Sequence, residues 1–244
     1  MEKVTAAIIT KNEENNIERC LKSLDWVDEI LVLDSGSTDK TLEICAKYKT
    51  KIVETEWLGF GRTKKAAVET ASNNWVLSID ADEEVSKELQ IRIKEILKQP
   101  IMNGYKIKRH SYFLGKRIKY CGWSSDYPVR LFDRTKGNFN NREVHESVEI
   151  DGNIGVLEEP LLHNTYPTIA VQLDKLNFYS EIQAKEFRNA GKKYSVISAL
   201  FFGLVKFLTM YIFRLGFLDG RAGFILCYNT AFSVYLKYIK TVQF

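Results

Sequence analysis

Residues 75–84 read WVLSIDADEE. Trp75 to Ile79 form a short apolar run rich in residues that favour β-strands, which is the pattern of a buried strand. The run ends on Asp80 and Asp82. Polar groups at the carboxyl end of a parallel strand stand in the crevice where open α/β sheets bind ligands. A capped turn would also explain the two carboxylates, because Asp-x-Asp alone is a weak signal.

The spacing of these carboxylates also bears on chemistry. Two acidic groups this close repel each other unless a cation neutralises them. Oxygen ligands with open coordination positions suit Mg²⁺ or Mn²⁺, the ions that usually accompany phosphates. The stretch therefore suggests a metal-assisted reaction of a phosphate-bearing substrate.

The whole chain fits one α/β domain with an appendage. It has 244 residues, of which 45% are hydrophobic and 27% charged, so it is globular rather than disordered. The four cysteines lack metal-ligand spacing, which favours a reducing compartment and argues against zinc. The opening MEKVTAAIITKNEE has no long apolar segment, so we expect no signal peptide.

Strand and helix patterns alternate along the first hundred residues. Strands are expected at 4–10, 29–33, 51–54 and 75–79, and helices at 15–24, 39–48, 62–71 and 84–98. This alternation predicts parallel strands with crossover helices, a Rossmann-like half. No Gly-x-Gly-x-x-Gly follows the first strand, which disfavours a dinucleotide cofactor.

Three motifs follow predicted strands: ITKNEE (9–14), VLDSGSTDKT (32–41) and SIDADEE (78–84). In this order the motifs resemble those of the family 2 inverting glycosyltransferases of the GT-A fold. The resemblance covers about residues 1–165. It implies that the chain moves a sugar from a nucleoside diphosphate to an acceptor with the help of Mg²⁺ or Mn²⁺.

The resemblance assigns roles to residues in these motifs. The nucleotide base would be held by the first loop and by the Asp that ends the second strand: Thr10, Lys11, Asn12, Glu13 and Asp34. In Asp80-Ala81-Asp82, the first Asp would lie near the ribose and the last would bind the metal. Arg62 or Lys64 would lie near the nucleotide. A turn would equally explain Asp34, and a solvated helix face would explain Arg62 and Lys64.

An inverting enzyme needs a base to take the proton of the acceptor hydroxyl, usually a carboxylate. That base must lie on the far face of the sugar from the metal, so we expect it from a later part of the chain. The candidates are Asp126, Glu143 and Glu146.

Two further segments, CGWSSDYPVRLFDR (121–134) and REVHESV (142–148), resemble a narrower branch, the lipopolysaccharide core glucosyltransferases that act on an inner-core heptose. By this match Glu146 is the preferred base and Asp126 the second choice. Acceptor contacts would come from Trp123, Arg130 and His145. The wider GT-A resemblance adds that a late His, here His163, would return to the metal or the diphosphate. The Glu-Asp and Gln-x-x-Arg-Trp motifs of many family 2 enzymes are missing, which argues against processive polymer synthesis.

Each of these residues also has a structural explanation. Trp123 could simply pack, and Glu146 could form a surface ion pair with Arg142. His163 could be a structural histidine.

The C-terminal segment is basic and apolar. Residues 192–244 hold seven Lys or Arg and one acid, Asp219. Residues 196–213 would form an apolar helix about 27 Å long, marginal for crossing a bilayer, with Lys206 near its centre. Residues 224–238 form a second, aromatic-rich run. The pattern predicts helices that lie on an anionic membrane surface, with an oligomer interface as the alternative.

We therefore expect a GT-A domain at 1–165, with a nucleotide-sugar half at 1–100 and an acceptor half at 101–165, and a helical membrane-association or oligomerisation region at 166–244. The expected enzyme is cytoplasmic and peripheral to the inner face of the membrane. It would move a hexose, glucose from UDP-glucose, to a phosphorylated, lipid-anchored acceptor. The basic residues around 106–119 suit that acceptor, and nucleic acid is not an expected partner. The alternatives are another lipid-linked or cell-wall acceptor, a nucleotidyltransferase, and a non-catalytic membrane scaffold.

Overall fold

The computed structural model describes residues 1–140 and 146–242, and the chain divides into two compact units. The sheet unit comprises residues 1–109 and 126–163, and the helical unit comprises residues 110–125 and those from Asn164 onward. The segment 110–125, which the sequence analysis grouped with the acceptor half, thus clusters with the C-terminal helices.

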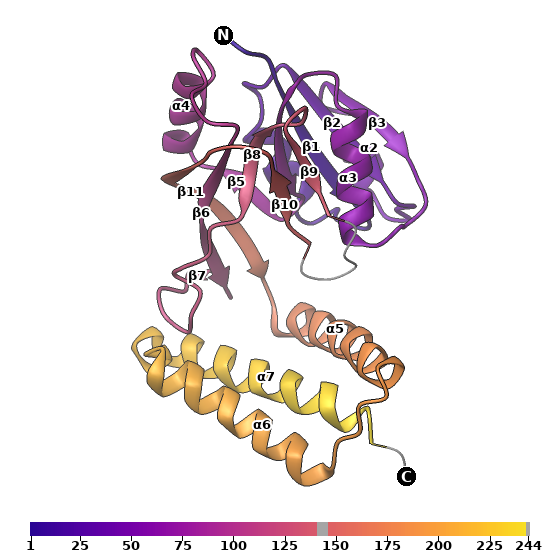
Figure 1. Cartoon of the computed structure of the whole chain (residues 1–244), viewed down its shortest axis with the longest axis vertical. Coiled ribbons are helices and arrows are strands. Elements are labelled where there is room, and N and C mark those ends of the chain that lie inside the picture. The colour runs from indigo at the N-terminus through magenta and orange to yellow at the C-terminus, as the bar shows by residue number, and fades with distance from the viewer. Residues whose placement is uncertain (141–145, 243–244) are drawn as a thin grey trace. The chain divides into compact units, whose positions relative to one another are not determined.

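The sheet unit is built on a mixed sheet whose parallel half lies at the start of the chain (Figure 1). The strand order begins β3 (Thr50–Glu54), β2 (Glu29–Asp34), β1 (Val4–Thr10) and β4 (Trp75–Asp80), and these four are parallel. It continues with β8 (Val129–Asp133), β6 (Gly104–Phe113), β11 (Ile154–Tyr166) and β5 (Glu83–Val85). In the helical unit, β7 (Lys116–Arg117) pairs with the last residues of β6. A small second sheet joins β9 (Gly137–Phe139) to β10 (Val148–Ile150).

Helices cover both faces of this sheet, because successive side chains of a strand point to opposite faces. In β1, Ala6 and Ile8 enter one core with α1 (Ile17–Lys22) and α4 (Lys87–Ile96), where α2 (Thr41–Cys45) adds Cys45. The intervening Ala7 enters the other core with α3 (Phe60–Thr70). The predicted α/β class and the parallel order of the first strands are confirmed.

The segment after Asp82 differs from the sequence prediction of a helix from residue 84. Glu83–Val85 form β5, which pairs antiparallel with β11, and α4 begins only at Lys87. The start of α4 is fixed by Ser86, whose hydroxyl accepts a hydrogen bond from the Leu89 N–H and caps the helix there. Edge pairing with a strand far along the chain therefore overrides the helical pattern of the acidic residues.

The helical unit contains α5 (Ile169–Asn189), α6 (Val196–Leu208) and α7 (Gly220–Ile239). A π-helical turn, η1 (Thr209–Phe213), and a 3₁₀ turn, η2 (Gly216–Asp219), join α6 to α7. The two C-terminal helices predicted at 196–213 and 224–238 are both present, but α7 starts four residues before the expected Phe224. The segment 110–125 shares a core with these helices, formed by Phe113, Ile118, Cys121, Met210, Leu226 and Cys227.

Candidate active site

The loops after β1 and β2 are held together by Asp34. Its buried carboxylate accepts hydrogen bonds from the Thr10 hydroxyl at 3.0 Å and from the N–H groups of Gly36 and Ser37 at 2.9 and 2.8 Å. Thr10 and Asp34 are direct partners in the parallel register. The turn needs Gly36, whose φ of +84° suits glycine. Asp34 therefore shapes the loop that is predicted to hold the nucleotide base.

Asn12 and Glu13 join the first loop to the second. The Asn12 side-chain oxygen accepts from the Thr38 N–H at 2.8 Å, and the Glu13 N–H donates to the Thr41 hydroxyl at 2.8 Å. Lys11 is exposed beside them. The sequence-predicted residues of both loops thus form one continuous rim at the carboxyl ends of β1 and β2.

Asp80, at the end of β4, lies between two cations. Its Oδ1 is 2.9 Å from the Lys64 ammonium, and its Oδ2 accepts a hydrogen bond from Arg130. Burial alone would raise the pKa of Asp80, but the charges of Arg130 and Lys64 outweigh it and hold that pKa well below its usual range. Asp80 is therefore a carboxylate at neutral pH.

Asp82 meets His163 through the pairing of β5 with β11. In that register His163 lies opposite Glu83, and its Nε2 is 3.4 Å from Asp82 Oδ1. Ala81, between the two acids, is buried. The tertiary structure thus brings together the two predicted metal ligands, which are 81 positions apart in the sequence.

Carboxylate oxygen and imidazole nitrogen are both ligands that Mn²⁺ accepts, and the carboxylate also suits Mg²⁺. Across residues 1–140 and 146–242, no three His, Cys, Asp or Glu side chains gather into a complete metal-binding group. Asp82 and His163 fit a metal that keeps its remaining positions for substrate oxygens and water, as Mg²⁺ usually does.

Lys64, in the second turn of α3, connects Asp80 to the preferred base. Its ammonium is 2.8 Å from Glu146 Oε1, and the residue is only 6% exposed. Glu146 therefore has a partner other than Arg142, which lies outside the described residues. Arg62, the other predicted cation, is exposed in the first turn of the same helix.

Glu83 is a functional candidate that the sequence analysis did not select. It is completely buried, and its carboxylate accepts hydrogen bonds from the Asp80 N–H at 3.0 Å, from Arg130 at 2.8 Å and from Arg109 at 3.1 Å. Arg109 in turn bonds the second base candidate, Asp126. The only signal for Glu83 in the sequence was its position as an acid directly after Asp-x-Asp. Its two arginine partners come from β6 and β8, which that position does not reveal.

These contacts form a chain of alternating charges inside the sheet unit, which we call the charge network. It links Glu146, Lys64, Asp80, Arg130, Glu83, Arg109 and Asp126 in that order. Both base candidates are thereby tied to the Asp-x-Asp segment. Arg130, predicted to contact the acceptor, is 4% exposed and holds Asp80 and Glu83, so its contacts favour a positioning role.

Trp123 is another residue that is predicted to contact the acceptor. Trp123 belongs to the helical unit, where it packs beside Tyr166 with ring centroids 6.2 Å apart and against the core of that unit. His145 and the third base candidate, Glu143, lie outside the described residues.

The comparisons with known proteins agree with this architecture. Residues 5–162 match the family model "Glycosyl transferase family 2". An uncharacterised glycosyltransferase of Rickettsia bellii is 35% identical over 254 residues, covering 98% of this chain and 85% of the relative. The lipopolysaccharide core biosynthesis glycosyltransferase LpsC of Rhizobium meliloti is 29% identical, covering 96% of this chain and 93% of LpsC.

Among solved structures, S. aureus TarS 1–349 in complex with UDP-GlcNAc has a TM-score of 0.52 at 16% identity, covering 96% of this chain and 81% of that one. At this identity the likeness concerns the fold. The family match spans the sheet unit with all three loop motifs, and the predicted family and fold are confirmed. The chain belongs to glycosyl transferase family 2 and is a glycosyltransferase enzyme with a GT-A fold.

Proposed function

We propose that this enzyme is a metal-dependent, inverting hexosyltransferase that moves glucose from UDP-glucose onto a lipid-anchored acceptor, an inner-core heptose of lipopolysaccharide. The observation that carries the proposal is the convergence of Asp34, Asp80, Asp82 and His163 at one edge of the parallel strands. That edge is where α/β sheets of this type bind ligands.

The donor assignment draws on the rim formed by the first two loops. Backbone and side-chain groups of Asn12 and of the turn after Asp34 are fixed by mutual hydrogen bonds, which suits a preformed nucleotide site. The TarS structure of similar fold contains UDP-GlcNAc. We carry over the uridine diphosphate donor class from that complex, and the choice of glucose from the sequence resemblance.

Departure of the nucleoside diphosphate leaves negative charge at the metal edge. A divalent metal at Asp82 and His163 would offset that charge. Asp80 is kept ionised by Lys64 and Arg130, so its oxygens can accept hydrogen bonds from a ribose. The protein groups hold the donor, and the acceptor must supply the attacking oxygen.

The proton of that oxygen goes to a carboxylate. We assign the base to Glu146, with Asp126 as the second choice. Both are side chains of the sheet unit with part of their surface accessible, and both are positioned by a cation of the charge network. His145 would orient Glu146 or the acceptor.

The acceptor assignment draws on LpsC, whose name places it in lipopolysaccharide core biosynthesis, and on the helical unit. One helical segment, Val196–Phe213, is long and apolar enough to cross a membrane by length and composition, with a mean hydropathy of 2.0 and 17% of it buried. Large apolar side chains along it are exposed, for example Ile197, Phe201 and Phe213. With the surplus of cations in 192–244, this supports attachment to the cytoplasmic face of an anionic membrane.

The test begins with donor binding. The full chain is heated with UDP-glucose, UDP-GlcNAc or GDP-mannose, each with and without Mn²⁺. Saturating donor should stabilise the folded state by about 2.7 kcal/mol at a hundred times its dissociation constant. Stabilisation by UDP-glucose that requires the metal is expected.

The second stage is transfer to heptose-terminated lipid acceptor, with the anomeric configuration of the product read by NMR. A new β-linkage from the α-linked donor supports inversion. Release of pyrophosphate from a nucleoside triphosphate without sugar transfer would instead identify a nucleotidyltransferase. A folded protein that binds no nucleotide sugar would leave only the scaffold alternative.

A further inference from the structure

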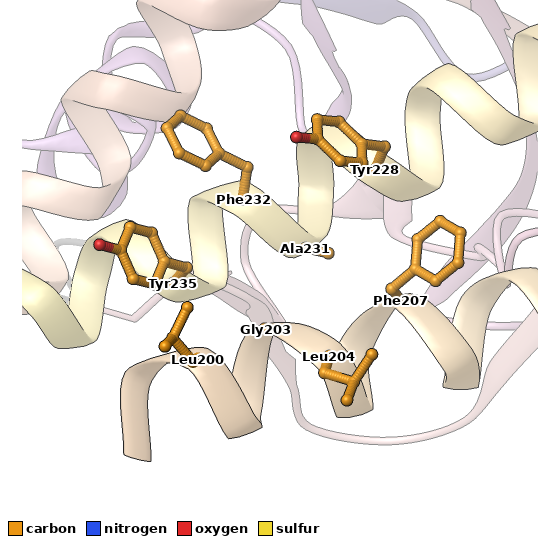
Figure 2. Close-up of a pocket in the computed structure, with 8 residues that line it drawn as sticks. All are labelled: Leu200, Gly203, Leu204, Phe207, Tyr228, Ala231, Phe232 and Tyr235. Carbon is orange, nitrogen blue, oxygen red and sulfur yellow. The ribbon is translucent and has the colours of Figure 1, made fainter. Parts of the chain in front are cut away.

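An apolar groove runs between α6 and α7 in the helical unit. Its volume is about 460 Å³, and Figure 2 shows side chains of both helices around it. The residues that line it are Leu200, Gly203, Leu204, Phe207, Tyr228, Ala231, Phe232 and Tyr235. They are apolar except for two phenol groups, so the groove suits a hydrocarbon chain rather than a polar ligand.

The groove exists because the two helices approach closely along only part of their length. A Cβ on Gly203 would lie 3.3 Å from the Ala231 carbonyl oxygen, which fixes the point of close approach. Larger side chains on either side, such as Leu204 and Tyr228, stand over the gap and remain more than half exposed. Helix packing thus leaves an apolar channel open to the surface.

A cationic pocket adjoins this groove. It is lined by Tyr211, Gly220, Arg221, Phe224 and Ile225 and has a volume of about 410 Å³. Aromatic residues that line the two cavities are in contact: the ring centroids of Phe207 and Tyr211 are 5.2 Å apart, and those of Phe224 and Tyr228 are 6.4 Å apart. Arg221 is exposed at the start of α7. The apolar groove and the pocket that holds Arg221 are therefore neighbours along the same helix pair.

We propose that these two neighbouring cavities together bind one anionic phospholipid of the membrane leaflet, with an acyl chain in the groove and the phosphate at Arg221. A guanidinium group binds phosphate oxygens through paired N–H donors. Aromatic rings between a cation and an apolar channel suit the boundary between headgroups and acyl chains. This proposal rests on the membrane part of the proposed function and refines it from a general surface to a single lipid site.

Charge argues against a second copy of the chain as the occupant. Asp219 is the only acid between residues 192 and 244, and it is 3% exposed. Its carboxylate already accepts from the N–H groups of Lys119 and Tyr120. Two such helix pairs brought together would oppose cation to cation, whereas a phospholipid supplies the missing negative charge.

The test uses the full chain and dioctanoyl phosphatidylglycerol, dispersed as monomers and titrated by calorimetry. We expect saturable binding of one lipid per chain. Leu204→Trp, which fills the groove from an exposed position, should weaken binding at least about tenfold. The control is Ile91→Trp, 60% exposed on α4 of the sheet unit, which should bind as the parent does.

Arg221→Gln tests the headgroup. This variant should bind the phospholipid about fivefold more weakly, which is equivalent to about 1 kcal/mol for one cation at an anionic lipid. Its binding of dioctanoylglycerol, which has no phosphate, should be unchanged. UDP-glucose binding is measured in the same samples, so that failure of the donor site is distinguished from failure of the lipid site.

Two results would overturn the proposal. Binding to anionic vesicles without any saturable binding of monomeric lipid would indicate a non-specific surface. A concentration-dependent dimer that Leu204→Trp dissociates, with no lipid binding, would make the groove an interface between copies.

Discussion

Lys64 and Glu146 are 82 positions apart in the sequence, yet the Lys64 Nζ lies 2.8 Å from Glu146 Oε1. The same ammonium lies 2.9 Å from Asp80 Oδ1. One buried cation therefore holds both the first acid of the Asp-x-Asp segment and the preferred base. A change at Asp80 is therefore physically linked to Glu146 through Lys64.

Asp82→Ala should abolish transfer and remove the metal dependence of nucleotide-sugar binding, because the diphosphate loses its link to the metal. Transfer and Mn²⁺-dependent thermal stabilisation measure the two effects. The control is Glu84→Ala, since Glu84 forms a partly exposed ion pair with Arg19 and should tolerate the change. Full turnover in folded Asp82→Ala protein would refute the metal assignment.

Glu146→Gln should retain donor binding and lower kcat by about 10²–10⁴, because only proton removal from the acceptor is lost. Steady-state kinetics with varied donor and acceptor separate kcat from KM. Asp126→Asn is the companion variant. An active Glu146→Gln enzyme beside an inactive Asp126→Asn enzyme would transfer the role of base to Asp126.

Lys64→Met should be energetically coupled to Glu146→Gln. Removing the Lys64 ammonium leaves the Glu146 carboxylate without its ion-pair partner. The loss in free energy of unfolding for the double variant should therefore be smaller than the sum of the losses for the two single variants. A coupling of roughly 0.5–3 kcal/mol is expected from urea unfolding. The exposed pair Lys47 and Glu43 is the control, and its cycle should give about 0.3–0.5 kcal/mol. Strict additivity for Lys64 and Glu146 would contradict the contact.

Glu83→Gln should destabilise the sheet unit by about 3 kcal/mol, because breaking a buried ion network leaves charges uncompensated. Glu84→Gln, one position along the chain and partly exposed, should cost no more than about 1 kcal/mol. Urea midpoints at constant slope compare the two variants. Equal urea midpoints for the two variants would show that the charge of Glu83 does not stabilise the sheet unit through the charge network.

Ile197→Glu combined with Phe213→Glu should weaken binding to anionic vesicles at least about tenfold, because each side chain is 79% exposed and would otherwise bury apolar surface in the membrane. Sedimentation with vesicles measures this, and UDP-glucose binding should be unchanged. Salt should weaken the binding of the parent protein to vesicles only partly, since salt screens charges but does not affect the burial of apolar surface. The control carries Ile91→Glu and Ile101→Glu, which are exposed in the sheet unit.

Point substitutions are preferable to removing the C-terminal helices. Phe113, Ile118 and Cys121 are buried against Met210, Leu226 and Cys227. A chain ending near Lys193 would expose the first three residues to water and would confuse misfolding with lost membrane binding.

The sequence by itself determined the parallel half of the fold. Strands β1, β2 and β4 were predicted nearly to the residue because a buried strand requires a continuous apolar run, which is a local property. The three loop motifs followed from those strands, since the carboxyl ends of parallel strands meet at one edge. The family assignment also came from these local patterns.

Only the tertiary structure decided which charges meet. β5 and β11 were not predicted, because an edge pairing between residues 83–85 and 161–163 has no periodic signature in either segment. That pairing brings His163 to Asp82. The positions of Arg109 and Arg130 beside Glu83 likewise depend on β6 and β8, and on no pattern near Glu83 itself. A buried charge is stable only with partners, and those partners are chosen by packing across the sheet rather than by neighbours along the chain.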